Sequence, residues 1–366
     1  MRNIRVLHIG LSSNVGGIET VVHSWLKYKP EWLHFDFIQI GDEKIAFEED
    51  FINSGARIYR ITPRSANIKK SNKELRDIVE KGHYDFVHHH LMSFSWPEPA
   101  LVTSKHSNSK IILHAHTVLS GHFSVKYRIL HFIGKARLKN AHYIEVACSE
   151  EAGKAMYGDD AFAVVKNGID FTECQYNEIE REKIRAKYGF TTNNVVIGHV
   201  GRSAYEKNYP FLLKTFKVVQ ERIKNARLLL IGDILADKQI QDLIDELSIR
   251  DYVTCTGAVR GIRSFYSAMD IYYMPSIIEG VSVSLLEAQA SGLTCVVSEN
   301  VSKESAISER CLFVPISDAA NVAELIIKEA DMDNIQRNDV ALDNKYDLES
   351  TSKKMFDLYE SNGEIK

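Results

Sequence analysis

The chain has 366 residues, of which 45% are hydrophobic and 26% charged, a balance typical of a soluble globular protein long enough for two domains. No apolar run approaches the roughly 18 residues that a membrane-spanning helix needs, and the start, MRNIRVLHIG, lacks the apolar core and cleavage site of a signal peptide. The five cysteines are scattered without a CxxC pair, which indicates a reduced, cytoplasmic chain without a structural zinc site.

The chain has a net charge of -4, and this charge is unevenly distributed along the sequence. Residues 1–170 hold 22 Lys/Arg and 19 Asp/Glu, the remainder 23 and 30, and residues 101–140 hold seven basic residues and no acidic one. This asymmetry indicates an anionic surface or ligand near the N-terminal half. With a pI of about 6.4 and no recognisable motif, nucleic acid is not an expected partner.

Short β-rich runs alternate with amphipathic stretches of helix length. In the first half, strands are predicted at 4–10, 35–40, 56–59, 85–90, 110–116, 143–148 and 161–165, and helices at 18–29, 68–81 and 123–139. After a polar segment at 171–193 the rhythm restarts, with strands at 195–201, 227–233, 252–257, 270–275, 293–298 and 311–315, helices between them, and a last helix at 349–361. This predicts an α/β protein of two doubly wound parallel-sheet domains, with ligands beyond the carboxyl ends of the strands in the cleft between them.

Two of the predicted loops after strands carry residues suited to anions. Gly16 and Gly17 precede a helix, where glycine permits close backbone approach and the helix start offers N–H groups, although the turn is not a GxGxxG fingerprint. Arg202 and Lys207 lie in the loop GRSAYEKN and could clamp a diphosphate. The plainer alternatives are a tight turn for the first pair and solvated charges for the second.

Two glutamates bracket the stretch EGVSVSLLE. Ser284 and Glu287 match an S-x-x-E capping box, which is the structural interpretation of Glu287. That pattern does not explain Glu279, which stands before the helix beside a glycine. The alternative is that Glu279 accepts hydrogen bonds from sugar hydroxyls and Glu287 holds a ribose diol.

Nine of the fourteen histidines lie between residues 83 and 131. In the run 88–90, only His88 and His90 share a strand face, so a metal site is not expected. His116, at the end of a predicted strand, is a candidate ligand contact or a satisfied polar residue. The helix at 123–139 is basic and amphipathic, which fits packing on the sheet, docking onto anionic lipid, or both.

The motifs GGIE, HAHT, VVKNGID, GRSAYEKN and, most specifically, the segment 256–298 resemble glycosyltransferase family 4, and in particular the exopolysaccharide and capsule transferases of the EpsF type. The resemblance spans residues 3 to about 360. It implies the GT-B fold, with two Rossmann-like domains and a cleft between them. Residues 1–170 would bind the acceptor, the last helix (349–366) would cross back onto them, and residues 171–348 would bind the nucleotide sugar.

The resemblance also implies roles for individual residues. Glu279, His116, Lys207 and Arg202 would be catalytic, with Glu279 on the donor sugar, His116 near it, and the two basic residues on the diphosphate. Donor binding would involve Glu287 on the ribose and the following residues: Gly16, Gly17, Gly280, Val281, Ser282, Val283, Ser284, Leu285, Val259 and Arg260. The sequence departs from the family pattern at IGDILADK and at Lys166, which stands where a proline is usual.

The expected activity is therefore transfer of a sugar, with retention of configuration, from a UDP-hexose or UDP-N-acetylhexosamine to a saccharide acceptor carried on polyprenyl diphosphate. The expected setting is exopolysaccharide, capsule or O-antigen synthesis, on the inner face of a bacterial plasma membrane that the chain contacts through its basic helix. Neither a cofactor nor a metal is expected. Two alternatives stay open, a non-hydrolysing UDP-sugar epimerase of the same fold and an inert sugar- or lipid-binding relative.

Overall fold

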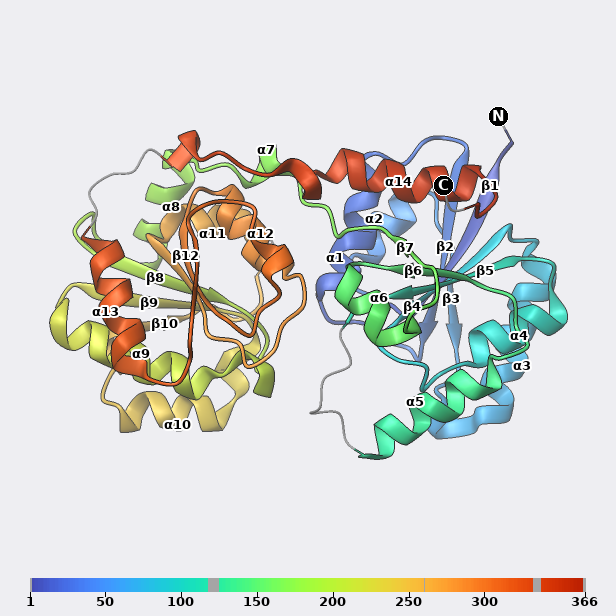
Figure 1. The fold of residues 1–366 in the computed structure, drawn as a ribbon, viewed down its shortest axis with the longest axis horizontal. Helices are drawn as coiled ribbons and strands as arrows, with labels where there is room; N and C mark the ends of the chain where they lie inside the picture. Colours follow the sequence, from blue (N-terminus) through green and yellow to red (C-terminus); the bar gives the residue numbers. More distant parts are fainter. Residues whose placement is uncertain (1, 118–124, 260, 332–336, 365–366) are drawn as a thin grey trace. The chain divides into compact units, whose positions relative to one another are not determined.

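The computed structural model describes residues 2–117, 125–259, 261–331 and 337–364, and the chain divides into two compact units (Figure 1). Unit 1 comprises Met1–Gly168 and Leu348–Lys366, and unit 2 comprises Ile169–Asp347. Each unit has its own parallel sheet covered by helices. The predicted fold class, two doubly wound parallel-sheet domains, is confirmed.

Unit 1 alternates strands and helices as the sequence pattern predicts. Its elements in chain order are β1 (Ile4–Ile9), α1 (Gly17–Ser24), η1 (Trp25–Lys27), β2 (Leu33–Ile40), α2 (Glu48–Asn53), β3 (Ile58–Ile61), α3 (Arg64–Gly82), β4 (Phe86–Leu91), α4 (Glu98–His106), β5 (Lys110–Ala115), α5 (Val125–Arg137), β6 (Ile144–Ala147), α6 (Glu150–Tyr157), β7 (Ala163–Val164) and α14 (Leu348–Glu360). The strand order is β3-β2-β1-β4-β5-β6-β7, with every pairing parallel.

The run of three histidines lies on β4, which is buried along its whole length. His88 and His90 point to one face of the sheet, where their rings stack 4.3 Å apart. His89 points to the other face, with its ring edge-on to Trp96 at 5.1 Å. The predicted alternation is confirmed, because successive side chains of a strand point to opposite faces.

Helix α14 lies against unit 1 (Figure 1). Its buried side chains include the aromatic and apolar residues Leu348, Met355, Phe356, Leu358 and Tyr359. The Tyr359 ring lies 5.3 Å from that of Phe86 on β4, and its hydroxyl lies 2.6 Å from Nδ1 of His88. The end of the chain is therefore part of the hydrophobic core of unit 1.

Helix α5 leaves most of its apolar side chains exposed, so packing on the sheet accounts for only a small part of them. The apolar stripe Tyr127, Leu130, Ile133 and Ala136 is not the packing face, since Leu130 and Ile133 are exposed. The helix instead rests on the unit through His131 and Gly134, and a side chain at position 134 would overlap the Phe94 carbonyl. Residues 123 and 124, the start of the predicted helix, lie outside the described residues.

Unit 2 contains a second doubly wound sheet of strand order β10-β9-β8-β11-β12-β13. Its helices and strands are α7 (Phe171–Cys174), α8 (Glu178–Tyr188), β8 (Val195–Val200), η2 (Tyr205–Lys207), α9 (Tyr209–Arg222), β9 (Ala226–Ile231), α10 (Lys238–Glu246), β10 (Val253–Cys255), α11 (Arg263–Ala268), β11 (Ile271–Met274), α12 (Val283–Ala290), β12 (Thr294–Ser298), β13 (Cys311–Val314) and α13 (Ala319–Ala330). The connections from β8 lead to β9 and β10 on one side and to β11 and beyond on the other, so the sheet has its topological switch point between β8 and β11.

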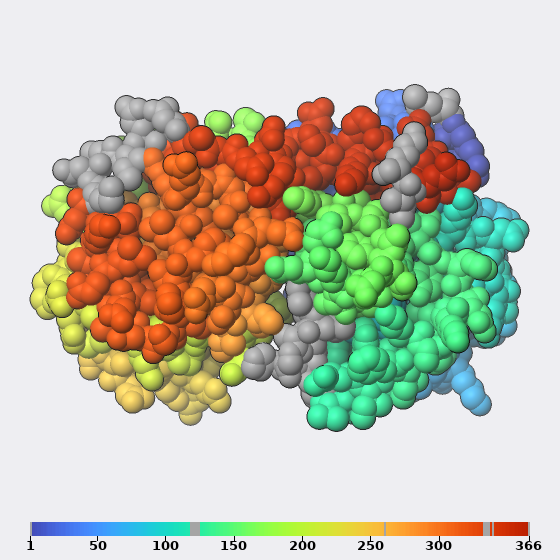
Figure 2. Space-filling view, in the orientation of Figure 1, coloured from blue at the N-terminus to red at the C-terminus, as the bar shows by residue number. Residues whose placement is uncertain are grey.

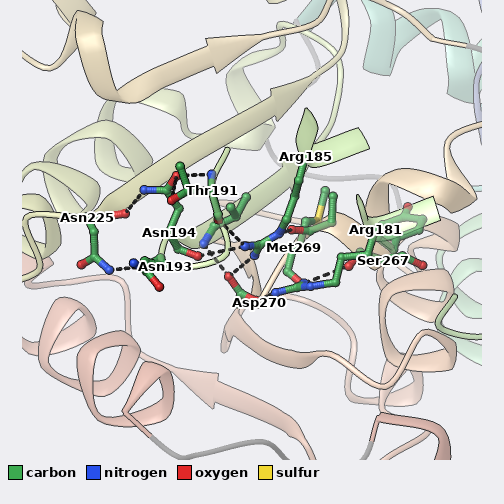
Figure 3. A network of polar contacts seen from close by, with 12 residues as sticks. Arg181, Arg185, Thr191, Asn193, Asn194, Asn225, Ser267, Met269 and Asp270 are labelled. Atoms are coloured by element: carbon green, nitrogen blue, oxygen red, sulfur yellow. Dashed lines mark hydrogen bonds and ion pairs between the residues drawn. The ribbon is translucent and has the colours of Figure 1, made fainter. Parts of the chain in front are cut away.

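The polar segment 171–193 is more than a connection, because it folds into α7 and α8 within unit 2. Asp270, just before β11, accepts hydrogen bonds at 2.6 Å from both Arg181 and Arg185 of α8 (Figure 3). The same carboxylate accepts from the backbone N–H of Val196 at 2.7 Å. This network fixes α8 to the amino ends of β8 and β11.

Among the described residues, no helix combines the length and the apolar character that crossing a membrane requires.

Candidate functional site

The carboxyl ends of β8 and β11 in unit 2 present two loops at the switch point, where ligands of open parallel sheets bind. These loops are joined by hydrogen bonds. The N–H of Ile277 donates to the Glu206 carbonyl at 2.8 Å, and the Asn208 side chain donates to the Pro275 carbonyl at 3.1 Å. The residues that follow β8 are thereby held against those that follow β11.

Lys207 and Glu279 meet across these loops. Nζ of Lys207 lies 2.6 Å from Oε2 of Glu279, and their side chains are only 12% and 21% exposed. The main chain of Glu279 is fixed in turn, because its carbonyl accepts from the N–H of Ser302 at 3.0 Å. Two residues singled out separately in the sequence therefore form one ion pair.

Arg202 does not join this pair in the described structure. Its side chain is 57% exposed, and Nη2 lies 3.7 Å from Oε1 of Glu206, one turn further along the chain. A long, exposed guanidinium at this loop remains free to reach an anion, whereas Lys207 is already held in place.

The N-terminus of α12 lies beside Glu279. Ser282 is the N-cap and makes no side-chain capping bond, and the first intrahelical bond runs from the N–H of Leu286 to the Ser282 carbonyl at 3.1 Å. The N–H groups of Val283, Ser284 and Leu285 accordingly lack intrahelical acceptors. Such a helix start attracts anions through these donors and the helix dipole.

The predicted capping box at Ser284 and Glu287 is wrong. The helix begins two residues earlier than that box requires, and Oγ of Ser284 instead accepts from the Tyr272 hydroxyl at 3.0 Å and lies 3.1 Å from Oγ of Ser282. Glu287 lies in the second turn of α12, too far along for a cap. Its carboxylate therefore does not cap α12.

Glu287 is a buried carboxylate, with a side chain that is 7% exposed. Tyr266 donates to Oε2 at 2.9 Å, and Nε of Arg263 lies 3.8 Å from Oε1. Burial raises the pKa of the Glu287 carboxyl, while Arg263 and the Tyr266 hydrogen bond oppose that shift. Oε1 is therefore the oxygen of Glu287 that the protein engages less closely.

Tyr266 and Arg263 were not identified from the sequence as part of a site. Both lie on α11, and strand β11 separates them from α12 along the chain. The sequence signal was weak, because a tyrosine in a buried helix is most often a core residue.

The remaining donor candidates of this unit are Gly280, Val281, Val259 and Arg260. The Gly280 carbonyl accepts from Oγ of Ser305 at 3.3 Å, and Val281 packs against a small core cluster that includes Leu286 and Ile307. Val259 follows β10 and packs on the core of unit 2. Arg260 lies outside the described residues.

In unit 1, Gly16 is the N-cap of α1, which begins at Gly17. The Glu19 carboxylate reaches back over this turn and accepts from the N–H and Oγ of Ser12, at 2.7 and 2.9 Å. A Cβ at Gly16 would approach Oε2 of Glu19 to 2.7 Å, so a larger residue there would require the end of this carboxylate side chain to shift. Glu19 is a structural element of the turn that sequence reasoning missed.

His116 follows β5, and its backbone N–H donates to the Leu91 carbonyl at 3.0 Å. Its Nε2 lies 2.9 Å from Nδ1 of His90, and burial lowers the pKa of His116 to about 3. The ring is therefore neutral near pH 7 and held by a neighbouring histidine of the sheet.

Residues 180–340, which make up most of unit 2, match the family model "Glycosyl transferases group 1". The match identifies unit 2 as a glycosyltransferase group 1 domain. Over 314 residues the chain is 29% identical to EpsF of Bacillus subtilis (strain 168), which is named as a glycosyltransferase, and the match covers 82% of this chain and 80% of EpsF.

One further relative and one solved structure are similar to this chain over most of its length. The UDP-Gal:alpha-D-GlcNAc-diphosphoundecaprenol alpha-1,3-galactosyltransferase of Escherichia coli is 24% identical, with 81% of this chain and 79% of the relative covered. The crystal structure of Anabaena HepE in complex with UDP-glucose has a TM-score of 0.78 and 16% identity, covering 98% of this chain and all of HepE. The shared fold is GT-B, as the sequence resemblance implied.

Proposed function

We propose that this glycosyltransferase moves a sugar from a nucleotide-sugar donor, a UDP-hexose or UDP-N-acetylhexosamine, to a saccharide carried on polyprenyl diphosphate. Two of the similar proteins support this choice of donor and acceptor. HepE was crystallised in complex with UDP-glucose, and the Escherichia coli enzyme is named for UDP-Gal and a diphosphoundecaprenol acceptor. The setting would be the synthesis of exopolysaccharide, capsule or O-antigen. Another relative, CapM of Staphylococcus aureus, is named for capsular polysaccharide biosynthesis and is 32% identical over 141 residues.

The observation that carries the proposal is the Lys207–Glu279 ion pair beside the open N-terminus of α12. An ammonium and a row of N–H groups at one switch point suit a diphosphate, and an adjacent carboxylate suits sugar hydroxyls. Glu287, held by Tyr266 one turn inside the helix, would accept from the ribose hydroxyls. Arg202 would swing from Glu206 to the diphosphate.

The transfer step we propose retains the configuration at the anomeric carbon. An acceptor oxygen bonds to this carbon on the face from which the diphosphate departs, the bond from carbon to the diphosphate oxygen breaks, and the acceptor proton passes to the leaving diphosphate. Lys207, Arg202 and the N–H groups at the start of α12 would stabilise the negative charge that develops there. This scheme assigns charge neutralisation to protein groups and requires no metal for the transfer.

Unit 1 would supply the acceptor side of the reaction. Within the proposal, the Gly16–Gly17 turn would face the donor diphosphate and His116 would lie near the transferred sugar. The neutral state of His116 suits a hydrogen bond to a sugar hydroxyl, because a neutral imidazole can accept as well as donate.

We further propose that α5 docks this enzyme onto the inner face of the plasma membrane, as a peripheral contact. Five large apolar side chains of α5 are exposed: Val125, Ile129, Leu130, Phe132 and Ile133. Basic residues Lys126, Arg128 and Lys139 are exposed on the same segment, which Figure 2 shows in blue-green at the surface. Exposed apolar side chains interleaved with basic ones are typical of a helix that lies in the interface of an anionic bilayer.

The experiment that tests the function uses tag-free protein, a panel of nucleotide sugars and polyprenyl-diphosphate-linked saccharides, with products identified by mass spectrometry. The expected result is an acceptor heavier by one sugar and release of a nucleoside diphosphate. Lys207→Ala and Glu279→Gln should abolish transfer, while Lys217→Ala and Glu221→Gln, a partly exposed pair on α9, should not. An epimer formed from the nucleotide sugar alone, with no acceptor extended, would overturn the proposal in favour of an epimerase, and no reaction with any donor would favour an inert binder.

A further inference from the structure

One face of the unit 1 sheet carries a layer of five histidines from three adjacent strands. His8 comes from β1, His88 and His90 from β4, and His114 and His116 from the end of β5. Four of them are buried, and His116 is partly exposed at the carboxyl end of β5. Trp25 lies close to the layer, with its ring stacked on that of His114 at 6.4 Å.

Three of these histidines converge at the carboxyl edge. His90, His114 and His116 each offer a ring nitrogen within 4.8 Å of those offered by the other two. Nδ1 of His90 and Nε2 of His116 are 2.9 Å apart, and the rings of His114 and His116 are 4.1 Å apart. Nitrogens bound to one tetrahedral zinc at about 2.0–2.1 Å are roughly 3.3 Å apart, so small side-chain rotations would create that geometry.

His8 and His88 contact the ring nitrogens of His90 and His114 that do not face the converging group. Nδ1 of His8 lies 3.1 Å from Nε2 of His90, and Nε2 of His88 lies 3.1 Å from Nδ1 of His114. His88 is oriented in turn by the Tyr359 hydroxyl, 2.6 Å from its Nδ1. Histidine ligands of metals are oriented in this way, by a partner on the ring nitrogen that does not bind the metal.

One inner nitrogen has no partner in the part of the chain that the structure describes. Nε2 of His114 is buried and makes no hydrogen bond there, while its Nδ1 is held by His88. If Nδ1 of His114 donates to His88, Nε2 carries a lone pair aimed away from that bond. A buried lone pair without a donor is unusual in proteins, and a bound cation would satisfy it.

We propose that His90, His114 and His116 bind one divalent transition-metal ion, of the class of Zn²⁺ or Co²⁺. His90 would bind through Nδ1, His114 through Nε2 and His116 through Nε2. All three ligands are neutral imidazoles, and the partly exposed position of His116 leaves a fourth coordination position open to water or an anion. The site shares His116 with the proposed transfer chemistry, but metal binding rests on the three histidines and does not depend on that chemistry.

A second group of ring nitrogens within 4.8 Å of one another comes from His8, His88 and His90. It is the weaker candidate for a metal site. All three side chains are buried, and aromatic side chains of β2 surround His8, with Phe35 4.4 Å and Phe37 5.3 Å away. A divalent cation at these buried histidines would have no anionic ligand to balance its charge and no coordination position open to water. A cation bound by His90, His114 and His116 avoids this problem, because water or an anion can complete its coordination.

The test titrates tag-free, chelator-treated full-length protein with CoCl₂ and, by calorimetry, with ZnCl₂. The expected result is one equivalent bound, with the intense visible absorption of tetrahedral Co²⁺. His116→Gln and His114→Gln should each weaken binding by at least about tenfold, whereas His106→Gln, at an exposed contact with Glu80, should not change it.

Absence of a one-equivalent site would overturn the proposal, as would binding that His116→Gln leaves unchanged, and the layer would then be a hydrogen-bonded core of neutral rings. If His114→Gln fails to fold, His116→Gln carries the test, because this side chain lies at the edge of the core. No nucleotide sugar enters the measurement, so its outcome is independent of the proposed transferase reaction.

Discussion

Nζ of Lys207 and Oε2 of Glu279 form an ion pair at 2.6 Å that joins the loops following β8 and β11. In the absence of a donor, the two side chains neutralise each other. A diphosphate that takes over Lys207 would release the Glu279 carboxylate toward the sugar, so the same pair can couple recognition of the two halves of a nucleotide sugar.

Glu279 and Glu287 should differ in which part of the donor they recognise. Glu287→Gln should weaken the binding of both UDP and UDP-sugars by about tenfold or more, because a hydrogen bond to a charged group is worth about 1.5–3 kcal/mol. Glu279→Gln should weaken only the binding of UDP-sugars. Calorimetric titrations of both variants with UDP and with UDP-glucose check this, and equal losses for the two ligands in Glu279→Gln would contradict the assignment.

Asp270 should be among the most stabilising carboxylates of unit 2. Asp270→Ala leaves the guanidinium groups of Arg181 and Arg185 without their shared partner, and removal of one member of a largely buried pair costs about 3–5 kcal/mol (Figure 3). Urea unfolding measures the loss. Asp245→Ala, which breaks an exposed pair with Arg250, should cost about 0–1 kcal/mol, and similar losses for the two variants would contradict the role of the network.

Glu145 on β6 should make unit 1 less stable at higher pH. Burial and the neighbouring Asp160 raise the pKa of its carboxyl to about 7, against the effect of Lys135. The native state therefore keeps a proton that the unfolded chain releases near pH 4.5, and the resulting stability, fully present below pH 4.5, is lost as the pH rises through about 7.

The permanently neutral Glu145→Gln variant should escape this loss. Its Tm relative to the parent should increase from pH 5 to pH 8, as followed by thermal melts across that range. The exposed Glu151→Gln on α6 serves as the control and should show a constant difference. A constant difference for Glu145→Gln as well would exclude the effect.

Apolar and basic side chains of α5 should both contribute to membrane binding. Ile129→Ser, Phe132→Ser and Ile133→Ser combined should greatly reduce flotation with vesicles containing anionic phospholipid, and Ile179→Ser, a 75% exposed position on α8, should not. Charge reversal at Lys126, Arg128 and Lys139 should weaken binding by at least about tenfold, because each basic residue contributes about 1 kcal/mol near such a surface. Undiminished flotation of the apolar variant would remove the docking proposal.

The choice of basic residues comes from the structure. Lys135 donates to the carbonyls of Met156 and Tyr157, and Arg137 pairs with Glu98, so reversing these charges would disturb unit 1 itself. The sequence did not distinguish them from Lys126 or Lys139, because every basic residue of an amphipathic helix looks alike without the position of the helix. For the same reason the sequence left open whether the apolar side chains of α5 serve packing or docking, and the structure shows that its buried positions are His131 and Gly134.

Much of the fold followed from the alternation of buried strands and amphipathic helices, since strands of a parallel sheet are nearly continuous apolar runs. The loops carrying Lys207 and Glu279 could also be located, because ligands gather where such strands end. Sequence reasoning failed where the answer depended on contacts between distant elements. Of the two interpretations of Glu287, the capping box failed because α12 begins two residues before it, and nothing local in the sequence connects Glu287 to Tyr266 on another helix.

The central claim is that the ends of β8 and β11 hold the diphosphate of a nucleotide sugar, and calorimetric titration of UDP-glucose and UDP-N-acetylglucosamine into the parent and Lys207→Ala tests it most directly. We predict saturable binding of at least one donor by the parent, weakened about 10- to 100-fold in Lys207→Ala and unchanged in Lys214→Ala, an exposed lysine on α9. Equal affinity of Lys207→Ala and the parent for that donor would contradict the claim.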